Sequence, residues 1–220
     1  MKIFKINSKT KKKDLLVYED RIKNKNLIWV KQIIKILKFY FPKKKKKIND
    51  LGCNLFQLYK GLKNQRLNKK FLYFGYDHDK TYINYGLKYF PELKKKYKVL
   101  DLEKKRPMKA DISVISATLE HLNKPSAALD NFLRSTNQLV IIRSFFGKKK
   151  IKKLFNNKKY VDNPYYINQY SFSWVKNLLL KQNFKIIEIQ KDKATEGRIK
   201  RIYPEIYRKF YIIIAKKNVI

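Results

Sequence analysis

The hydrophobic positions along the chain follow two spacings, one typical of helices and one typical of buried strands. Residues 27–41 place apolar side chains three and four positions apart, which predicts an amphipathic helix. Pro42 is expected to end this helix, because a proline disfavours the helical conformation of the residue before it. A short buried strand is then predicted at residues 48–52, and a second helix at 56–68.

The same alternation of strand and helix continues to the C-terminus. Further strands are predicted at 71–77, 97–103, 111–117, 138–146, 184–190 and 210–217, and further helices at 80–90, 124–136 and 171–183. Ser171 or Ser173 can cap the last helix. Alternating strands and helices favour parallel β-α-β units. No helix of ordinary length is predicted between residues 190 and 210, so the last two strands are expected to pair antiparallel. The pattern predicts an α/β fold with a seven-stranded, mostly parallel sheet, a reversed C-terminal strand and helices on both faces.

Length and composition fit one folded unit. With 220 residues, of which 44% are hydrophobic, the chain can form one substantial core. No repeat or flexible linker divides it, so we expect a basic N-terminal segment with the amphipathic helix over 1–47 and the main domain over 48–220. The single cysteine, Cys53, excludes an internal disulfide and lacks the companions of a zinc site. No apolar run reaches the ~18 residues of a membrane span, and we expect a cytoplasmic protein.

Charge is the most extreme feature of the composition. The formal net charge is +37, and a basic surface attracts nucleic acids by releasing their counterions. However, 46 of the 54 basic residues are lysine, whereas bidentate recognition of phosphates and bases favours arginine. Lys, Asn, Ile, Phe and Tyr together exceed half of the chain and share A/T-rich codons. A biased gene composition can therefore produce the charge without any partner, and a nucleic-acid partner stays open but is not favoured.

Acidic residues lie where the first three predicted strands end. Asp50 and Gly52 close the first strand, Asp77 ends the second 25 residues after Gly52, and Asp101 lies in the third. Ligands of open α/β sheets bind beyond the carboxyl ends of the strands. A glycine there lets a ligand approach the backbone, and a carboxylate at the second strand can accept both ribose hydroxyls. An aspartate at the end of a strand is, taken alone, more often a capping or turn residue. The three together, in this order, predict one shared binding site for a nucleoside.

Four segments carry a resemblance to a known family. They are DLGCN (50–54), YFGYDHD (73–79), VLDLE (99–103) and ADISVISATLEHL (110–122). These segments resemble the successive motifs of class I S-adenosylmethionine-dependent methyltransferases, and the match covers roughly residues 45–147. The resemblance implies a Rossmann-like fold, S-adenosyl-L-methionine as the cofactor and a methyltransferase-like catalytic domain over residues 48–220.

The resemblance also implies a set of cofactor-binding residues. The set is Asp50, Gly52 and Asn54 at the methionine end, Asp77 with His78 at the ribose, Asp101 and Leu102 at the adenine, and Ser116 beneath the cofactor.

The first loop departs from the family pattern. Family members commonly have glycine at the position of Asn54 and often again at that of Phe56. Asparagine tolerates a positive φ angle better than most residues, so Asn54 can take the backbone role of a glycine. Phe56 either packs under the sheet or narrows the pocket, and we favour packing. A nicotinamide dehydrogenase would need glycines at Asn54 and Gln57, which argues against that class.

Two residues after the fourth strand are candidates for catalysis. Methyl transfer from a sulfonium mainly requires alignment of the acceptor and, for some acceptors, removal of a proton. Glu120 and His121 lie close to the expected methyl group, and the ordinary pKa of histidine suits a general base. Structural roles in the loop stay open for both. Arg143 and Ser144, at the next strand end, can bind an acidic or hydroxylated acceptor or pair with a buried carboxylate.

An aromatic segment follows the fifth strand. Asn163-Pro164-Tyr165 is similar to part of a signature of amino-group methyltransferases, but it follows the wrong strand, and we interpret it as a turn. Tyr165, Tyr166, Tyr170 and Trp174 are expected to form an aromatic wall over the acceptor site. The INQYS stretch at 167–171 is similar to methyltransferases of surface-glycan gene sets, which favours a hydroxyl of a glycan or small molecule. An RNA acceptor and a non-catalytic binding protein stay open.

Overall fold

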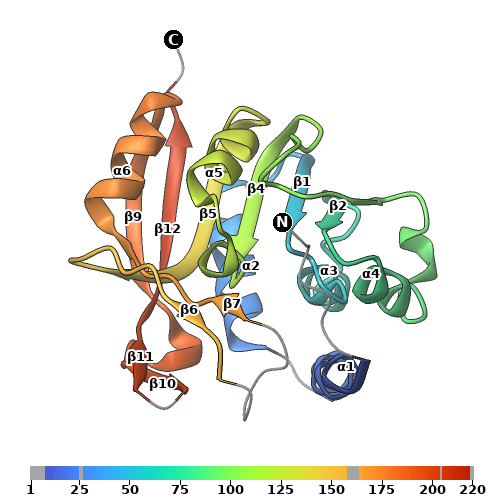
Figure 1. Ribbon diagram of the computed structural model, residues 1–220. Coiled ribbons are helices and arrows are strands. Elements are labelled where there is room, and N and C mark those ends of the chain that lie inside the picture. The colour runs from blue at the N-terminus through green and yellow to red at the C-terminus, as the bar shows by residue number, and fades with distance from the viewer. Residues whose placement is uncertain (1–7, 25–26, 158–163, 204, 219–220) are drawn as a thin grey trace.

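The computed structural model describes residues 8–24, 27–157, 164–203 and 205–218, so Asn163 of the predicted turn lies outside the described residues. A main sheet crosses the molecule (Figure 1). Its seven-stranded path is β3 (Tyr97–Val99), β2 (Phe71–Asp77), β1 (Lys46–Leu51), β4 (Ala110–Ser116), β5 (Thr136–Gly147), β12 (Phe210–Lys217) and β9 (Phe184–Lys191). A short eighth strand, β8 (Tyr170–Ser171), pairs with the far end of β5.

The direction of the strands follows the prediction. β1, β2, β3, β4 and β5 pair in parallel, whereas β12 is antiparallel to both of its neighbours, β5 and β9. The expected antiparallel pair at the C-terminus is therefore confirmed, and β12 is the reversed strand of an otherwise parallel sheet.

Helices cover both faces of the sheet (Figure 1). One face carries α2 (Ile28–Tyr40), α3 (Gln57–Asn64) and α4 (Lys80–Gly86), and the other carries α5 (Pro125–Leu133) and α6 (Phe172–Lys181). The first helix, α1 (Ser8–Lys23), contacts α4 and the residues after it, because Glu19 accepts hydrogen bonds from Tyr85 of α4 and from Tyr89 beyond its end. No helix within the described ranges is long and apolar enough to cross a membrane.

The apolar runs of the central strands explain this two-sided arrangement. Successive side chains of a strand point to opposite faces. In β5, Leu139 and Ile141 pack on the side of α2, α3 and α4, whereas Val140 and Ile142 pack on the side of α5 and α6. All four are buried, and burying such a side chain contributes about 1.5–3 kcal/mol. A continuous apolar run thus stabilises both layers of helices.

Several element boundaries have visible causes. The Ser171 hydroxyl accepts a hydrogen bond from the Trp174 N–H at 3.2 Å and starts α6, as predicted. Pro125 lies in the first turn of α5, where its missing N–H costs nothing. α2 ends at Tyr40, two residues before Pro42.

The prediction that Asp101 lies within a strand was wrong. β3 ends at Val99, and Asp101 begins a turn. Its carboxylate accepts a hydrogen bond from the Glu103 N–H at 2.9 Å, and its carbonyl oxygen accepts from the Lys104 and Lys105 N–H groups. An aspartate whose side chain bonds to the backbone two residues on favours such a turn over a strand.

Two hairpins were not predicted. β6 (Leu154–Phe155) pairs with β7 (Tyr165–Tyr166), and β10 (Lys200–Tyr203) pairs with β11 (Ile206–Arg208) within the connection between β9 and β12. An aromatic cluster joins the hairpins, because the Phe155 ring stacks on the Tyr203 ring with centroids 4.2 Å apart. These strands are too short for a period-2 pattern to reveal them.

Candidate cofactor and acceptor site

The loop after β1 is held against the end of β2 by its backbone. The N–H groups of Gly52 and Cys53 both donate to the Tyr76 carbonyl oxygen, at 2.8 and 2.9 Å. The Asn54 N–H donates to Asp77 Oδ2 at 2.9 Å. Gly52 and Asn54 have φ angles of 77° and 48°, in the left-handed region that most residues avoid. Asn54 therefore adopts the backbone conformation that the family pattern assigns to a glycine.

Gly52 also marks a close contact with the loop after β4. A Cβ atom on Gly52 would lie 2.0 Å from Oγ1 of Thr118 and 2.8 Å from its Cγ2. The two loops therefore meet at this glycine. Sequence reasoning did not single out Thr118, although it lies in the same motif as Glu120 and His121.

Phe56 is packed in the core. Its side chain has no exposed surface, and its ring fills space that Gly75 and Gly86 leave open. A Cβ atom on either glycine would come within 2.9 Å of the Phe56 ring, at 2.9 Å for Gly75 and 2.7 Å for Gly86. The ring also meets Tyr73 edge to face, with centroids 6.3 Å apart. Phe56 has a φ of 62°, so its packing stabilises a backbone conformation that is unusual for an aromatic residue.

The three strand-end carboxylates contact three different parts of the chain. Asp50 is buried and accepts a hydrogen bond from the Tyr73 hydroxyl at 2.7 Å. Asp77 holds the Asn54 N–H, and Asp101, partly exposed, lies 3.1 Å from the Lys104 amine. Asp50 and Asp77 lie close enough to interact, since the Asp77 charge helps to raise the pKa of Asp50. That all three carboxylates converge on one shared binding site stays a prediction.

Burial changes the protonation of the first two carboxylates. Burial raises the pKa of Asp50 to about 7, and the Tyr73 hydrogen bond opposes this shift only in part. Burial also raises the pKa of Asp77, while His78 and the backbone N–H groups of Asp79 and Asn54 lower it. His78 itself is exposed, with Nδ1 3.4 Å from Asp77 Oδ1.

The other predicted cofactor residues lie at the ends of the third and fourth strands. Leu102 is buried in the core under α5, and its carbonyl oxygen accepts a hydrogen bond from the Asn131 amide at 2.8 Å. Ser116 ends β4; its carbonyl oxygen accepts from the Thr118 hydroxyl at 3.2 Å, and its hydroxyl lies 3.5 Å from Nη1 of Arg143. Ser116 is thus beside the contact between the two loops.

Glu120 anchors the loop after β4. It lies in the short 3-10 helix η2 (Leu119–His121), and only 1% of it is exposed. The Ser144 hydroxyl donates to Glu120 Oε2 at 2.6 Å, which links η2 to β5. The Asn168 N–H donates to the Glu120 carbonyl oxygen at 2.9 Å and links η2 to the segment before β8. Both Glu120 and Ser144 are buried, so they hold the loop in place.

His121 is exposed beside these anchors. Its Nδ1 lies 2.8 Å from the Tyr166 carbonyl oxygen. A carbonyl oxygen only accepts, so Nδ1 of the neutral ring carries the hydrogen and Nε2 has a free lone pair. The Tyr165 ring lies 5.3 Å from the His121 ring, centroid to centroid. The structure therefore brings together His121 and two of the four predicted wall residues.

Arg143 and Tyr170 are buried, whereas Trp174 is partly buried. The Arg143 guanidinium forms an ion pair of 2.8 Å with Asp192, and it lies over the Phe210 ring. Pairing with a carboxylate, one of the two interpretations of Arg143, is thus observed. Tyr170 is buried; its hydroxyl donates to the Leu119 carbonyl oxygen at 2.7 Å, and its ring stacks on Trp174. Tyr170 therefore supports η2 from within the core, and Trp174 covers its ring.

Comparisons with known proteins place the fold. No family model matches the sequence, and no curated protein matches it at a significant level. Among solved structures, an S-adenosylmethionine-dependent methyltransferase from Clostridium acetobutylicum superimposes with a TM-score of 0.66 at 9% identity, covering 96% of this chain and 100% of that one. Magnesium protoporphyrin IX methyltransferase from Synechocystis, solved with bound S-adenosylmethionine, gives 0.62 at 15% identity, covering 99% and 100%.

A third similar structure is 1,6-didemethyltoxoflavin-N1-methyltransferase from Burkholderia thailandensis, with a TM-score of 0.60 at 10% identity, covering 99% of this chain and 94% of that one. At such identities the likeness shows the fold. The chain has the Rossmann-like α/β fold of S-adenosylmethionine-dependent methyltransferases, over almost its whole length.

Proposed function

We propose that this chain is an S-adenosylmethionine-dependent methyltransferase that acts on a hydroxyl of a small-molecule or glycan acceptor. The observation that carries this proposal is the left-handed loop at Gly52 and Asn54, bonded directly to the Asp77 carboxylate. The loop lies at the carboxyl ends of parallel strands, where ligands of such sheets bind. Similar structures solved with S-adenosylmethionine or S-adenosylhomocysteine support the choice of cofactor.

The donors and acceptors of the loop fit the proposed cofactor. Each Asp77 oxygen accepts one hydrogen bond, from Asn54 or from Asp79, and a carboxylate offers about four acceptor positions. Two positions therefore remain for the two ribose hydroxyls. Gly52 and Asn54 would lie at the methionine end, with Asp50 beneath the loop.

Four residues would complete the cofactor site. His78 would lie beside the ribose, Asp101 and Leu102 would border the adenine, and Ser116 would lie beneath the cofactor.

His121 has the geometry of a general base. When bound, the cofactor supplies an electrophilic methyl group. The acceptor hydroxyl would pass its proton to His121 Nε2 as its oxygen bonds to the methyl carbon, while the bond from that carbon to sulfur would break and S-adenosylhomocysteine would leave with the electron pair. The Nδ1–H of His121 would stay bonded to the Tyr166 carbonyl oxygen. Glu120, buried against Ser144, would position His121. Named acceptors of similar structures, such as the didemethyltoxoflavin of the Burkholderia enzyme, support a small-molecule acceptor.

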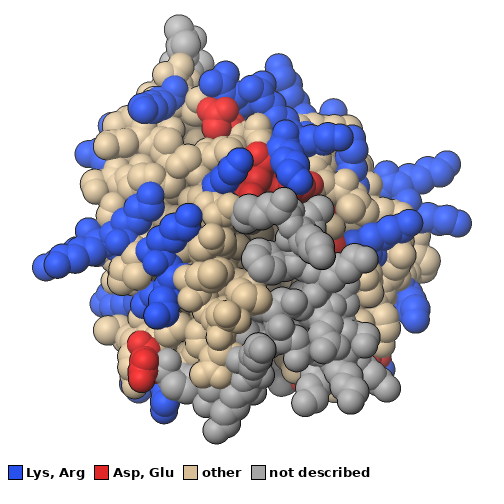
Figure 2. All heavy atoms as spheres, in the orientation of Figure 1, with Lys and Arg blue, Asp and Glu red and all other residues tan. Residues whose placement is uncertain are grey.

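The composition of the charge does not favour an RNA acceptor, because 46 of the 54 basic residues are lysine. On the described part of the face in Figure 2, Lys and Arg side chains lie in several separate groups. An RNA methyltransferase would need a basic surface continuous with the site.

Calorimetry with S-adenosylhomocysteine tests the cofactor proposal. We expect the unaltered chain to bind it and Asp77→Asn to bind about tenfold or more weakly, since hydrogen bonds to a charged acceptor contribute about 1.5–3 kcal/mol. Asp130→Asn removes the same charge from α5, on the opposite face, and should leave the affinity unchanged. If the unaltered chain does not bind millimolar S-adenosylhomocysteine, only the alternative of a non-catalytic protein with the same fold would remain.

A further inference from the structure

A hollow of about 220 Å³ lies between α2 and α3, and no part of the proposed reaction uses it. The two helices cross closely at Gly61, where a Cβ atom would lie 2.2 Å from Cγ1 of Val30. Beside this crossing, the apolar side chains of Leu27, Val30 and Ile34 line the hollow. We call it the α2–α3 groove.

The groove contains a buried amide without a hydrogen-bond partner. Gln57, the first residue of α3, lines the groove and is only 9% exposed. Its Nε2 atom is buried and has no acceptor among the residues that the structure describes. Native proteins seldom leave such a donor unpaired. The oxygen and nitrogen of an amide exchange places by rotation about its last bond, so the NH₂ group can face the groove.

Cationic side chains from three helices line the same groove. They are Arg21 of α1, Lys31 of α2 and Lys60 of α3, and the described lining includes no carboxylate. The Lys60 amine donates to the Arg21 carbonyl oxygen at 3.4 Å, and burial lowers the pKa of Lys60. An anion between these three groups would stabilise their charged forms.

We propose that the α2–α3 groove binds a small organic anion, a phosphate or carboxylate on a compact apolar body. The oxyanion would accept hydrogen bonds from Gln57 Nε2 and pair with Arg21, Lys31 and Lys60. The apolar body would lie on the side chains of α2. The volume is below the ~300–1,000 Å³ of pockets for drug-sized ligands, so the ligand is smaller than a nucleotide.

This site is distinct from the proposed cofactor site. Gln57 follows Phe56, whose ring lies in the core beside Gly75 of β2 and Gly86 of α4, whereas Gln57 lines the groove between α2 and α3. The proposed anion site therefore does not depend on the proposed methyltransferase activity.

Calorimetry with phenyl phosphate and with benzoate tests the groove, using the full chain in 150 mM sodium chloride. We expect saturable binding of one equivalent of at least one probe, and the stronger of the two identifies the oxyanion. Gln57→Leu keeps the volume and removes the donor, and Arg21→Gln removes one cation; each should weaken binding about tenfold. Arg21 is partly exposed, so its variant remains informative if Gln57→Leu does not fold.

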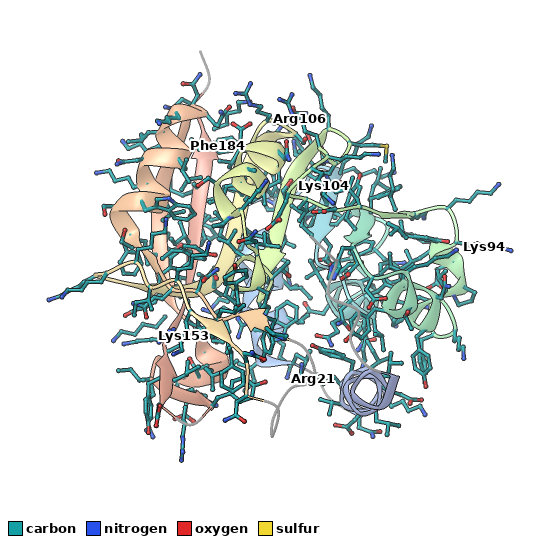
Figure 3. All side chains as sticks on the ribbon, in the orientation of Figure 1. Arg21, Lys94, Lys104, Arg106, Lys153 and Phe184 are labelled. Carbon is teal, nitrogen blue, oxygen red and sulfur yellow. The ribbon has the colours of Figure 1, made fainter. Side chains whose placement is uncertain are left out.

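Lys94→Gln provides the matched control. It removes the same charge as Arg21→Gln, and Figure 3 shows Lys94 at the far edge of the molecule, away from Arg21. It should leave the affinity unchanged, and saturating S-adenosylhomocysteine should not displace the probe. Equal weakening by Lys94→Gln would show general attraction to the basic surface and overturn the proposal. Displacement by S-adenosylhomocysteine, or no binding of either probe, would also overturn it.

Discussion

The loops after β1 and after β4 meet at Gly52 and Thr118, yet they are held in different ways. The first loop depends on backbone conformation, with three left-handed residues, Gly52, Asn54 and Phe56, and with backbone N–H groups as its donors. The second depends on buried side chains, such as the Glu120–Ser144 pair. Residue types within the first loop therefore set its backbone conformation, and its N–H groups then bond to Tyr76 and Asp77. In the second loop, side-chain bonds between buried residues set the position of the chain.

The largest expected effect comes from the first loop. Phe56→Ala removes the ring that fills the space beside Gly75 and Gly86, and it should lower the free energy of unfolding by about 3–5 kcal/mol. Phe39→Ala is the matched control, because Phe39 is 75% exposed and its loss should change stability little. Chemical denaturation measures both. A small effect of Phe56→Ala would mean that the ring does not support the loop.

Gly52→Ala should be nearly as damaging. Its φ of 77° costs a non-glycine residue about 1–2 kcal/mol, and the contact with Thr118 adds about 1–3 kcal/mol. Gly197→Ala separates the two causes, because Gly197 has a φ of 65° but faces only the flexible Lys191 side chain. In thermal unfolding, the melting temperature of Gly52→Ala should be well below that of Gly197→Ala. The double variant Gly52→Ala/Thr118→Ala should recover part of the stability that Gly52→Ala loses. Equal losses at both glycines would exclude the contact between the loops.

Removing the Ser144 hydroxyl should destabilise the loop after β4. Ser144→Ala leaves the buried Glu120 carboxylate without its donor, which costs about 1.5–3 kcal/mol. Ser126→Ala, at an exposed position of α5, should be close to neutral. Hydrogen exchange of the η2 backbone amides, compared between the two variants, shows whether the loss is local. Unchanged exchange in Ser144→Ala would contradict the anchoring role of Glu120.

The smallest expected effect concerns Asp50, because the change in the free energy of unfolding per pH unit is smaller than the effects of the substitutions above. Because burial raises its pKa to about 7, the folded chain binds a proton more tightly than the unfolded chain does. The contribution of Asp50 to the free energy of unfolding is therefore fully present below pH ~4. It is lost as the pH rises toward 7, by at most about 1.4 kcal/mol per pH unit. Asp50→Asn keeps an acceptor for Tyr73 and should flatten this dependence, leaving the part due to Asp77, whose pKa burial also raises. Identical pH profiles for both chains would argue that Asp50 is ionised in the fold.

Local patterns predicted the fold, since hydrophobic periodicity reports which faces of a strand or helix are covered. They also predicted the positive φ of Asn54, because residue type limits backbone conformation. Contacts between distant residues were not visible in the sequence. The Glu120–Ser144 bond spans 24 positions and the Tyr170–Leu119 bond spans 51, and no local pattern specifies either. Asp101 was wrongly predicted within a strand, because the hydrophobic pattern does not show that its carboxylate accepts a hydrogen bond from the Glu103 N–H and forms a turn.

A crystal structure of the chain with S-adenosylhomocysteine tests the central claim most directly. The account predicts both ribose hydroxyls within about 3 Å of the Asp77 carboxylate oxygens, and the homocysteine part beside Gly52 and Asn54. A ligand bound elsewhere, with Asp77 bonded only to the backbone, would contradict it.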